Sequence, residues 1–242
     1  AGTLAGTGTL TAALYALDGG TVAANLGAGT LSSRGDSRLD GTAAAGTVNI
    51  DAGTLRLGAA DRLSGAPALT VAAGATLQLD GNQTVGTLAG SGLVALSNAL
   101  LATGSGGDSR FDGVANGSGA LVKQGDSTFT LGGANLYTGT TRVDAGTLAL
   151  AAPERLADGS GVAVAAGATL ALGANDETVA AAGIAGTLSG SGRLSATTVN
   201  LDGAQVDAPV TTAALVSRGS STLNGVVTAG SVQVAGGTLQ LG

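Results

Sequence analysis

The clearest pattern in the chain lies in residues 119–150, which read GALVKQGDSTFTLGGANLYTGTTRVDAGTLAL. Apolar and polar residues alternate over runs of four positions, such as TFTL and TLAL, and each run is bounded by Gly, Asp or Asn. Alternation with a period of two predicts strands with one buried face, and the bounding residues are typical of tight turns. The segment therefore predicts short β-strands joined by tight corners.

This pattern recurs along the chain as internal repeats. Residues 2–58 align without a gap with residues 186–242, and residues 50–79 align with residues 143–172. In the second pair, both copies are followed by the element Gly-Thr-Leu-x-Gly-Ser-Gly. The segment before this element is seven residues longer in the later copy, so we expect an expanded loop near 173–185. Within each repeat, corner glycines recur every 18 to 21 residues.

Composition favours a narrow interior. Of the 242 residues, 44 are Gly and 44% are hydrophobic, but only 2% are aromatic. Such side chains fill a wide core poorly at native density, whereas stacked coils leave only a slim interior to fill. We therefore predict an all-β protein, a parallel β-helix (solenoid) of roughly a dozen coils. At ~4.8 Å per coil its length is about 55–60 Å. Only residues 58–65 and 151–159 have a pattern compatible with a helical turn.

Composition also excludes several kinds of chemistry. The chain has no Cys and no His, which removes thiol nucleophiles, imidazole bases and most zinc sites. A net charge of −6 argues against nucleic acid as a partner, and no apolar run is long enough to insert in a membrane. We predict no catalytic residue, no metal and no cofactor, and hence no enzyme. The N-terminal sequence lacks the features of a signal peptide, so either a targeting signal has been removed or the chain is an interior fragment. We favour the fragment, because the sequence begins and ends inside a repeat.

The candidate binding residues are Arg34, Gly35 and Asp36, because an exposed Arg-Gly-Asp tripeptide can engage integrins. The alternative is a repeat corner, since Gly-Asp-Ser recurs at 107–109 and 125–127 without the arginine. We favour the corner interpretation.

Three weaker motifs have structural alternatives as well. Residues 104–111 resemble a single calcium-binding nonapeptide, but calcium rolls need this unit in tandem. The carboxylates in the two Asp-Ser-Arg-x-Asp motifs, at 36–40 and 108–112, resemble a glycosidase pair, yet their intervening arginines indicate solvated charge pairing. The aromatic residues of 111–137 would form either a ligand platform or, as we favour, a filling for a wider coil.

Residues 111–192 resemble the passenger-associated repeat of bacterial autotransporters. The resemblance rests on these spaced positions: Phe111, Gly113, Leu121, Lys123, Gly125, Phe129, Leu131, Gly133, Asn135, Tyr137, Gly139, Thr141, Val143, Gly146 and Leu148. The stretch from Leu156 to Gly192 is similar to the region downstream of this repeat in members of the family, and partial copies extend the resemblance over nearly the whole chain.

The resemblance implies a right-handed parallel β-helix on the exterior of a Gram-negative outer membrane, exported by type V secretion. The partner it implies is a C-terminal translocator barrel of the same polypeptide, so residues 1–242 are expected to be one segment of a larger passenger. Two functions remain open. One is a stalk that supports export and folding and displays a distal region. The other is an adhesin that binds host cells or identical passengers. A polysaccharide lyase would need an acidic cluster with Arg or Lys, which the sequence lacks.

Overall fold

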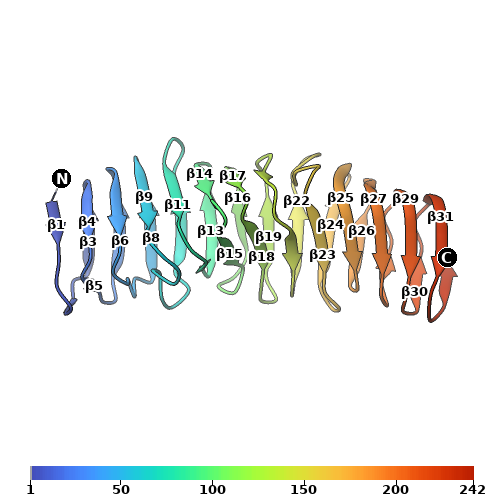
Figure 1. Ribbon diagram of the computed structural model, residues 1–242, viewed down its shortest axis with the longest axis horizontal. Coiled ribbons are helices and arrows are strands. Elements are labelled where there is room, and N and C mark those ends of the chain that lie inside the picture. The colour runs from blue at the N-terminus through green and yellow to red at the C-terminus, as the bar shows by residue number, and fades with distance from the viewer. Residues whose placement is uncertain (1) are drawn as a thin grey trace.

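The computed structural model describes residues 2–242, and all regular structure in this range is β-strand. The strands stack one behind another along the long axis of the molecule, with the two termini at opposite ends (Figure 1). Every strand pair is parallel, as in β1 with β4 and β30 with β32. Parallel pairing of strands along the chain means that each coil lies on the previous one, and the predicted β-solenoid is confirmed.

Four parallel sheets form the faces of the solenoid. The long sheet has 13 strands. Its strands are β3 (Leu14–Leu17), β6 (Thr30–Ser33), β8 (Thr47–Ile50), β10 (Ala68–Val71), β13 (Thr87–Gly90), β16 (Ser109–Phe111), β19 (Thr128–Leu131), β22 (Thr147–Leu150), β24 (Thr169–Gly173), β26 (Thr187–Gly190), β28 (Gln205–Val206), β30 (Ser221–Leu223) and β32 (Leu239–Leu241). Thirteen strands with ~4.8 Å between neighbours give a length of about 58 Å.

The N-terminal sheet has eight strands and covers a second face of the first coils. Its strands are β1 (Gly2–Leu4), β4 (Gly20–Val22), β7 (Ser37–Leu39), β9 (Thr54–Leu57), β11 (Thr76–Leu79), β14 (Leu93–Ala95), β17 (Val114–Gly117) and β20 (Leu136–Tyr137). A two-stranded sheet of β2 (Thr9–Leu10) and β5 (Asn25–Leu26) begins the third face, which isolated bridges continue through Ala43 to Leu63.

The C-terminal sheet has nine strands. They are β12 (Gln83–Thr84), β15 (Leu100–Thr103), β18 (Ala120–Lys123), β21 (Thr141–Val143), β23 (Gly161–Val164), β25 (Glu177–Ile184), β27 (Leu194–Leu201), β29 (Val210–Ser217) and β31 (Val227–Val234). The last four strands have eight residues each, and their pairing skips one residue near the middle. The inward alternation of β25 also shifts there, from Val179 to Ala182, as expected where a strand bends around a corner.

Alternate side chains of each strand fill the interior. In the long sheet, Leu31, Val48, Leu69 and Leu88 are stacked in register and are at most 1% exposed. Fully burying one such aliphatic side chain contributes roughly 1.5–3 kcal/mol. The ladder of small aliphatic residues therefore provides the core that the composition predicts.

Two expectations about local structure are wrong. Neither residues 58–65 nor residues 151–159 form a helical turn, because their backbone groups bond to neighbouring coils. For example, the N–H of Asp61 donates to the carbonyl of Asn82. The expanded loop near 173–185 is also absent, since most of these residues form β25. The seven extra residues do not form a protruding loop. They lengthen the strand segment at β25, which runs along one more face of the solenoid than the earlier copy does.

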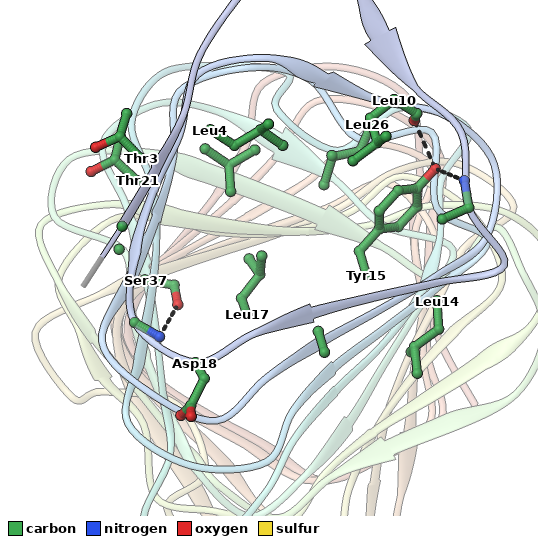
Figure 2. A pocket seen from close by; sticks show the side chains of 16 residues that line it. Thr3, Leu4, Leu10, Leu14, Tyr15, Leu17, Asp18, Thr21, Leu26 and Ser37 are labelled. Carbon is green, nitrogen blue, oxygen red and sulfur yellow. Dashed lines mark hydrogen bonds between the residues drawn. The ribbon is translucent and has the colours of Figure 1, made fainter.

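The N-terminal end of the solenoid is open (Figure 2). A cavity of about 440 Å³ lies in the first coils, and its lining includes the apolar side chains of Leu4, Leu10 and Leu26. Beside it, the hydroxyl of Tyr15 donates to the carbonyl of Leu10 at 2.9 Å and accepts from the N–H of Ala12 at 3.0 Å. At the other end, the side chains of β31 and β32 are mostly exposed. Unpaired strands and apolar interior are therefore accessible at both ends.

We expect isolated molecules of this chain to associate end to end, because an open strand edge pairs readily with another chain. Sedimentation velocity should show a species that grows with protein concentration. Leu10→Lys, which places a charge at the open end, should reduce it. The matched control is Leu136→Lys, since Leu136 is exposed on the side of the rod. Equal association of wild type and both variants would contradict this prediction.

Candidate functional site

The segment 111–148 forms the middle of the rod and brings an unusual set of side chains into its interior. Phe111, Phe129 and Tyr137 are each at most 1% exposed. These aromatic side chains fill the interior, as predicted, and so they do not form a ligand platform on the surface. The aliphatic positions of the same motif are also in the core; they are Leu121, Leu131, Val143 and Leu148.

Lys123 is fully buried at the end of β18. Its Nζ donates to the carbonyls of Gln124 (2.8 Å), Gly125 (2.7 Å) and Ala145 (3.1 Å). Two of these carbonyls belong to its own corner and the third to the next coil. Among the described residues its ammonium forms no ion pair. A buried cation therefore neutralises the partial charges of three converging carbonyl oxygens.

The environment of Lys123 disfavours its charge. Burial lowers the pKa of Lys123, and the negative charges of Asp126 and Asp108 oppose this effect only in part. The ammonium is retained because its three hydrogen bonds have a charged donor, which makes each of them stronger than a neutral bond.

Asn135 joins three successive coils. Its Oδ1 accepts from the N–H of Ala115 at 2.8 Å, and its Nδ2 donates to the carbonyls of Gly133 (3.1 Å) and Arg155 (2.9 Å). The side chain is only 2% exposed. A buried amide with acceptor and donor both satisfied stabilises one alignment of these coils, because a shifted register would leave its polar atoms unpaired.

Tyr137 and Thr141 complete the buried polar groups of this motif. Their hydroxyl oxygens lie 2.6 Å apart within the interior. Burial raises the pKa of Tyr137 well above its usual value, so the phenol stays protonated. The bond connects β20 with β21 across a corner of the same coil.

The glycines of the motif lie at corners where coils approach closely. Gly125 has a φ of 67°, and a Cβ there would lie 2.8 Å from the carbonyl oxygen of Gly104. At Gly133 a Cβ would collide with the backbone carbonyl of Gly113. The remaining three motif glycines, Gly113, Gly139 and Gly146, likewise lie close to the backbone of the preceding coil.

Arg34, Gly35 and Asp36 lie at an exposed corner between β6 and β7. The Nε of Arg34 lies 3.3 Å from a carboxylate oxygen of Asp51. The Oδ1 of Asp36 accepts from the N–H of Thr54 in the next coil at 2.9 Å.

The same hydrogen bond recurs at another corner, where Oδ1 of Asp108 accepts from the N–H of Thr128 at 2.7 Å. At a third corner the hydroxyl of Ser220 accepts from the N–H of Thr238 at 3.2 Å. The corner aspartate therefore connects successive coils, with or without a preceding arginine.

The paired carboxylates do not converge on a common point. Asp40 and Asp112 each pair with the arginine two residues earlier, at 2.7 Å in both cases. The other carboxylate of each pair, Asp36 or Asp108, accepts a hydrogen bond from a backbone amide. Such exposed ion pairs contribute little to stability, because solvent screens them. In residues 2–242 no cluster of three potential metal ligands is found.

Glu177 belongs to none of the motifs described above, yet it is the first residue of β25 and is fully buried. Its two oxygens accept from the backbone N–H groups of Arg155 and Leu156, both at 2.8 Å. Burial raises the pKa of Glu177 to about 7, against the opposing effect of these two bonds. The signal for it was present in the repeats, because Glu177 occupies the place that buried Gln83 has in the earlier copy.

Together these features define a parallel β-solenoid whose central coils are aligned by buried polar side chains. Residues 121–150 match the family model described as Passenger-associated-transport-repeat. Over 188 residues, 73% of the chain, the sequence is 32% identical to the "Adhesin BmaC autotransporter" of Brucella suis biovar 1 (strain 1330). The chain spans 6% of the length of that relative. No solved structure matches the chain.

The chain is therefore an autotransporter passenger sequence that carries the passenger-associated transport repeat. This assignment places it at the cell surface, on the exterior of the outer membrane. In residues 2–242 the structure contains no helix that is long and apolar enough to cross a membrane.

Proposed function

We propose that this chain is a non-enzymatic stalk segment that supports export and folding of its passenger and displays a distal functional region. The observation that carries this proposal is the set of buried polar groups in residues 123–141, which favour one alignment of successive coils. In a solenoid each coil contacts only its neighbours, so folding can propagate from a correctly aligned coil. Such propagation outside the cell would help to draw the remaining passenger outward through the barrel of the same polypeptide.

The test is export of a full passenger whose transport repeat is altered. We expect Lys123→Met to reduce the amount of passenger at the cell surface, measured with an antibody to a distal tag. Arg142→Met is the matched control, because Arg142 is exposed and, within residues 2–242, its ion pair is with Asp144 on the same face. Equal display of both variants and wild type would remove the support for a role in export.

A second candidate is an adhesin segment that binds host cells or identical passengers. The relative is named an adhesin. In addition, Thr128, Thr147, Thr169 and Thr187 are aligned along the long sheet and only partly buried. A regular polar face of this kind could pair with the same face of another rod.

Display of this segment on beads separates the two candidates. The displayed segment carries Leu10→Lys, so that pairing of open ends does not cause clumping. In this form a stalk should cause neither clumping nor attachment to host cells, whereas an adhesin should cause at least one of them. We expect Asp36→Glu to leave any attachment unchanged, because we interpret Asp36 as a repeat corner. Asp108→Glu is the matched control, since Asp108 makes the equivalent corner bond without a preceding arginine. Loss of attachment in Asp36→Glu alone would assign integrin binding to Arg34, Gly35 and Asp36.

A further inference from the structure

Two corners of the solenoid are built alike although they are 93 residues apart. The first corner loop comprises residues 59–63 and the second comprises residues 152–156. In the first, the guanidinium of Arg62 donates to the carbonyls of Ala60 and Asp40, at 3.0 and 2.6 Å. In the second, Arg155 makes the equivalent bonds to the carbonyls of Pro153 and Gly132, at 2.9 and 2.7 Å. The two loops therefore have matching frameworks.

The side chain that the next coil contributes to each loop is different. At the first corner loop, Oε1 of Gln83 accepts from the N–H of Leu63 at 3.1 Å, and Nε2 donates to the carbonyl of Ala59 at 2.7 Å. At the second, both oxygens of Glu177 accept, from Arg155 and Leu156. One loop is thus held by an acceptor and a donor, and the other by two acceptors.

Protonation removes this difference. An ionised carboxylate only accepts hydrogen bonds, whereas a protonated carboxyl group has one donor and one acceptor, like an amide. At the second corner loop, the residue equivalent to Ala59 is Ala152. We propose that Glu177 is a pH-sensitive latch on the second corner loop. Ionised, it holds the N–H groups of Arg155 and Leu156; protonated, it releases the N–H of Arg155 and donates to the carbonyl of Ala152.

With the charged groups that surround it, the pKa of Glu177 lies near neutral pH. Glu154 lies on the same loop and raises the pKa of Glu177, while its carboxylate binds the hydroxyl and N–H of Thr178. The guanidinium of Arg155 lowers the pKa of Glu177, and its hydrogen bonds go to backbone carbonyls. Tyr137 packs nearby and stays neutral.

On the remaining side, the carbonyl of Arg193, the residue before β27, accepts from the N–H of Glu177. The N–H of Arg193 in turn donates to Oδ1 of Asp176 at 2.8 Å.

The latch has a defined effect on stability. The pKa of Glu177 is raised in the folded chain to about 7, from an ordinary value of 4.5. The folded state therefore binds more protons than the unfolded state between these values, and its stability decreases as the pH rises through this window. Glu177→Gln should remove this part of the pH dependence. It should still fold, because Gln83 performs the same task at the first corner loop.

The experiment is an NMR titration of the full chain labelled with ¹³C at the Glu carboxyl carbons. The chain has only two Glu residues, so two signals appear, and the spectrum of Glu177→Gln assigns them. We expect the Glu177 signal to titrate near pH 7 and the amide signal of Arg155 to shift with the same midpoint. The amide of Leu63, which faces Gln83, should not follow it.

Two variants complete the test. Glu177→Gln should abolish the shift of the Arg155 amide, and Gln83→Glu should introduce a titration at the amide of Leu63. The proposal is overturned if Glu177 titrates near the ordinary pKa of a Glu carboxyl group. It is also overturned if the Arg155 amide signal does not shift when Glu177 titrates. It is also overturned if the amide shift persists in Glu177→Gln.

Discussion

Replacing Lys123 with Met is expected to lower the free energy of unfolding by about 3 kcal/mol, although Met preserves most of the side-chain volume. The carbonyls of Gln124, Gly125 and Ala145, which belong to partly buried residues, lose a common donor that is itself fully buried. Each buried acceptor left unsatisfied costs about 1–3 kcal/mol. Removing a desolvated charge offsets part of this loss, which is why we expect the lower end of the summed range.

Thermal and urea unfolding of the two proteins measure this effect, together with hydrogen exchange at the amides of β18 and β21. Exchange is needed because long repeat proteins can unfold in parts, in which case a single midpoint understates a local change. The control variant Arg142→Met should change the free energy by less than about 1 kcal/mol, since it removes only an exposed ion pair. If the two substitutions have the same effect, Lys123 does not hold the corner as described.

Gly133→Ala is expected to destabilise the solenoid by about 3 kcal/mol through a collision of backbone with backbone. The new methyl group would lie within the contact distance of the carbonyl oxygen and carbon of Gly113 in the previous coil. Overpacking costs about 1–3 kcal/mol even where side chains can move aside. In this case neither partner can rotate away, so the coils must separate locally.

The matched control is Gly46→Ala, because a Cβ at Gly46 would meet no atom within 4 Å. This substitution should change stability by no more than about 0.5 kcal/mol. Unfolding midpoints and protease sensitivity near residues 113–133 compare the two variants. A Gly133→Ala protein as stable as Gly46→Ala would show that the coils are not packed as closely at this corner as the structure has them.

The general architecture could be predicted because the relevant forces are local or repeat along the chain. Alternation in stretches such as 128–131 and 147–150 identified strands with one buried face, and both are strands. The small aliphatic composition then favoured stacked coils over a wide core. The burial of Phe129 and Tyr137 was expected because aromatic side chains more often fill a wider coil than form a ligand platform.

The candidate site was harder to predict, because burial of a polar side chain depends on neighbours that are distant in sequence. Lys123 was noted only as part of a motif, and its three acceptors become visible only when residue 145 lies over residue 125. Glu177 was missed because its two donors belong to the preceding coil, 21 and 22 residues earlier. Nothing in the local sequence distinguishes it from an exposed acid.

What the amino-acid sequence determined by itself was the strand pattern, the corners and the existence of repeats. What only the tertiary structure decided was the face on which each repeat lies. Residues 54–57 and 147–150 are equivalent in sequence, yet β9 belongs to the N-terminal sheet and β22 to the long sheet. The seven extra residues before 186 then return both copies to the long sheet, as β13 and β26.

The physical reason is that a coil closes when its strand hydrogen-bonds to the strand of the previous coil, not when a sequence motif recurs. Neighbouring strands of the long sheet are 16 residues apart at Leu14 and Thr30 but 22 apart at Thr147 and Thr169. A separation of 93 residues therefore does not amount to a whole number of coils. Alternation and turn residues are local properties, whereas the face is fixed by the summed length of all intervening coils.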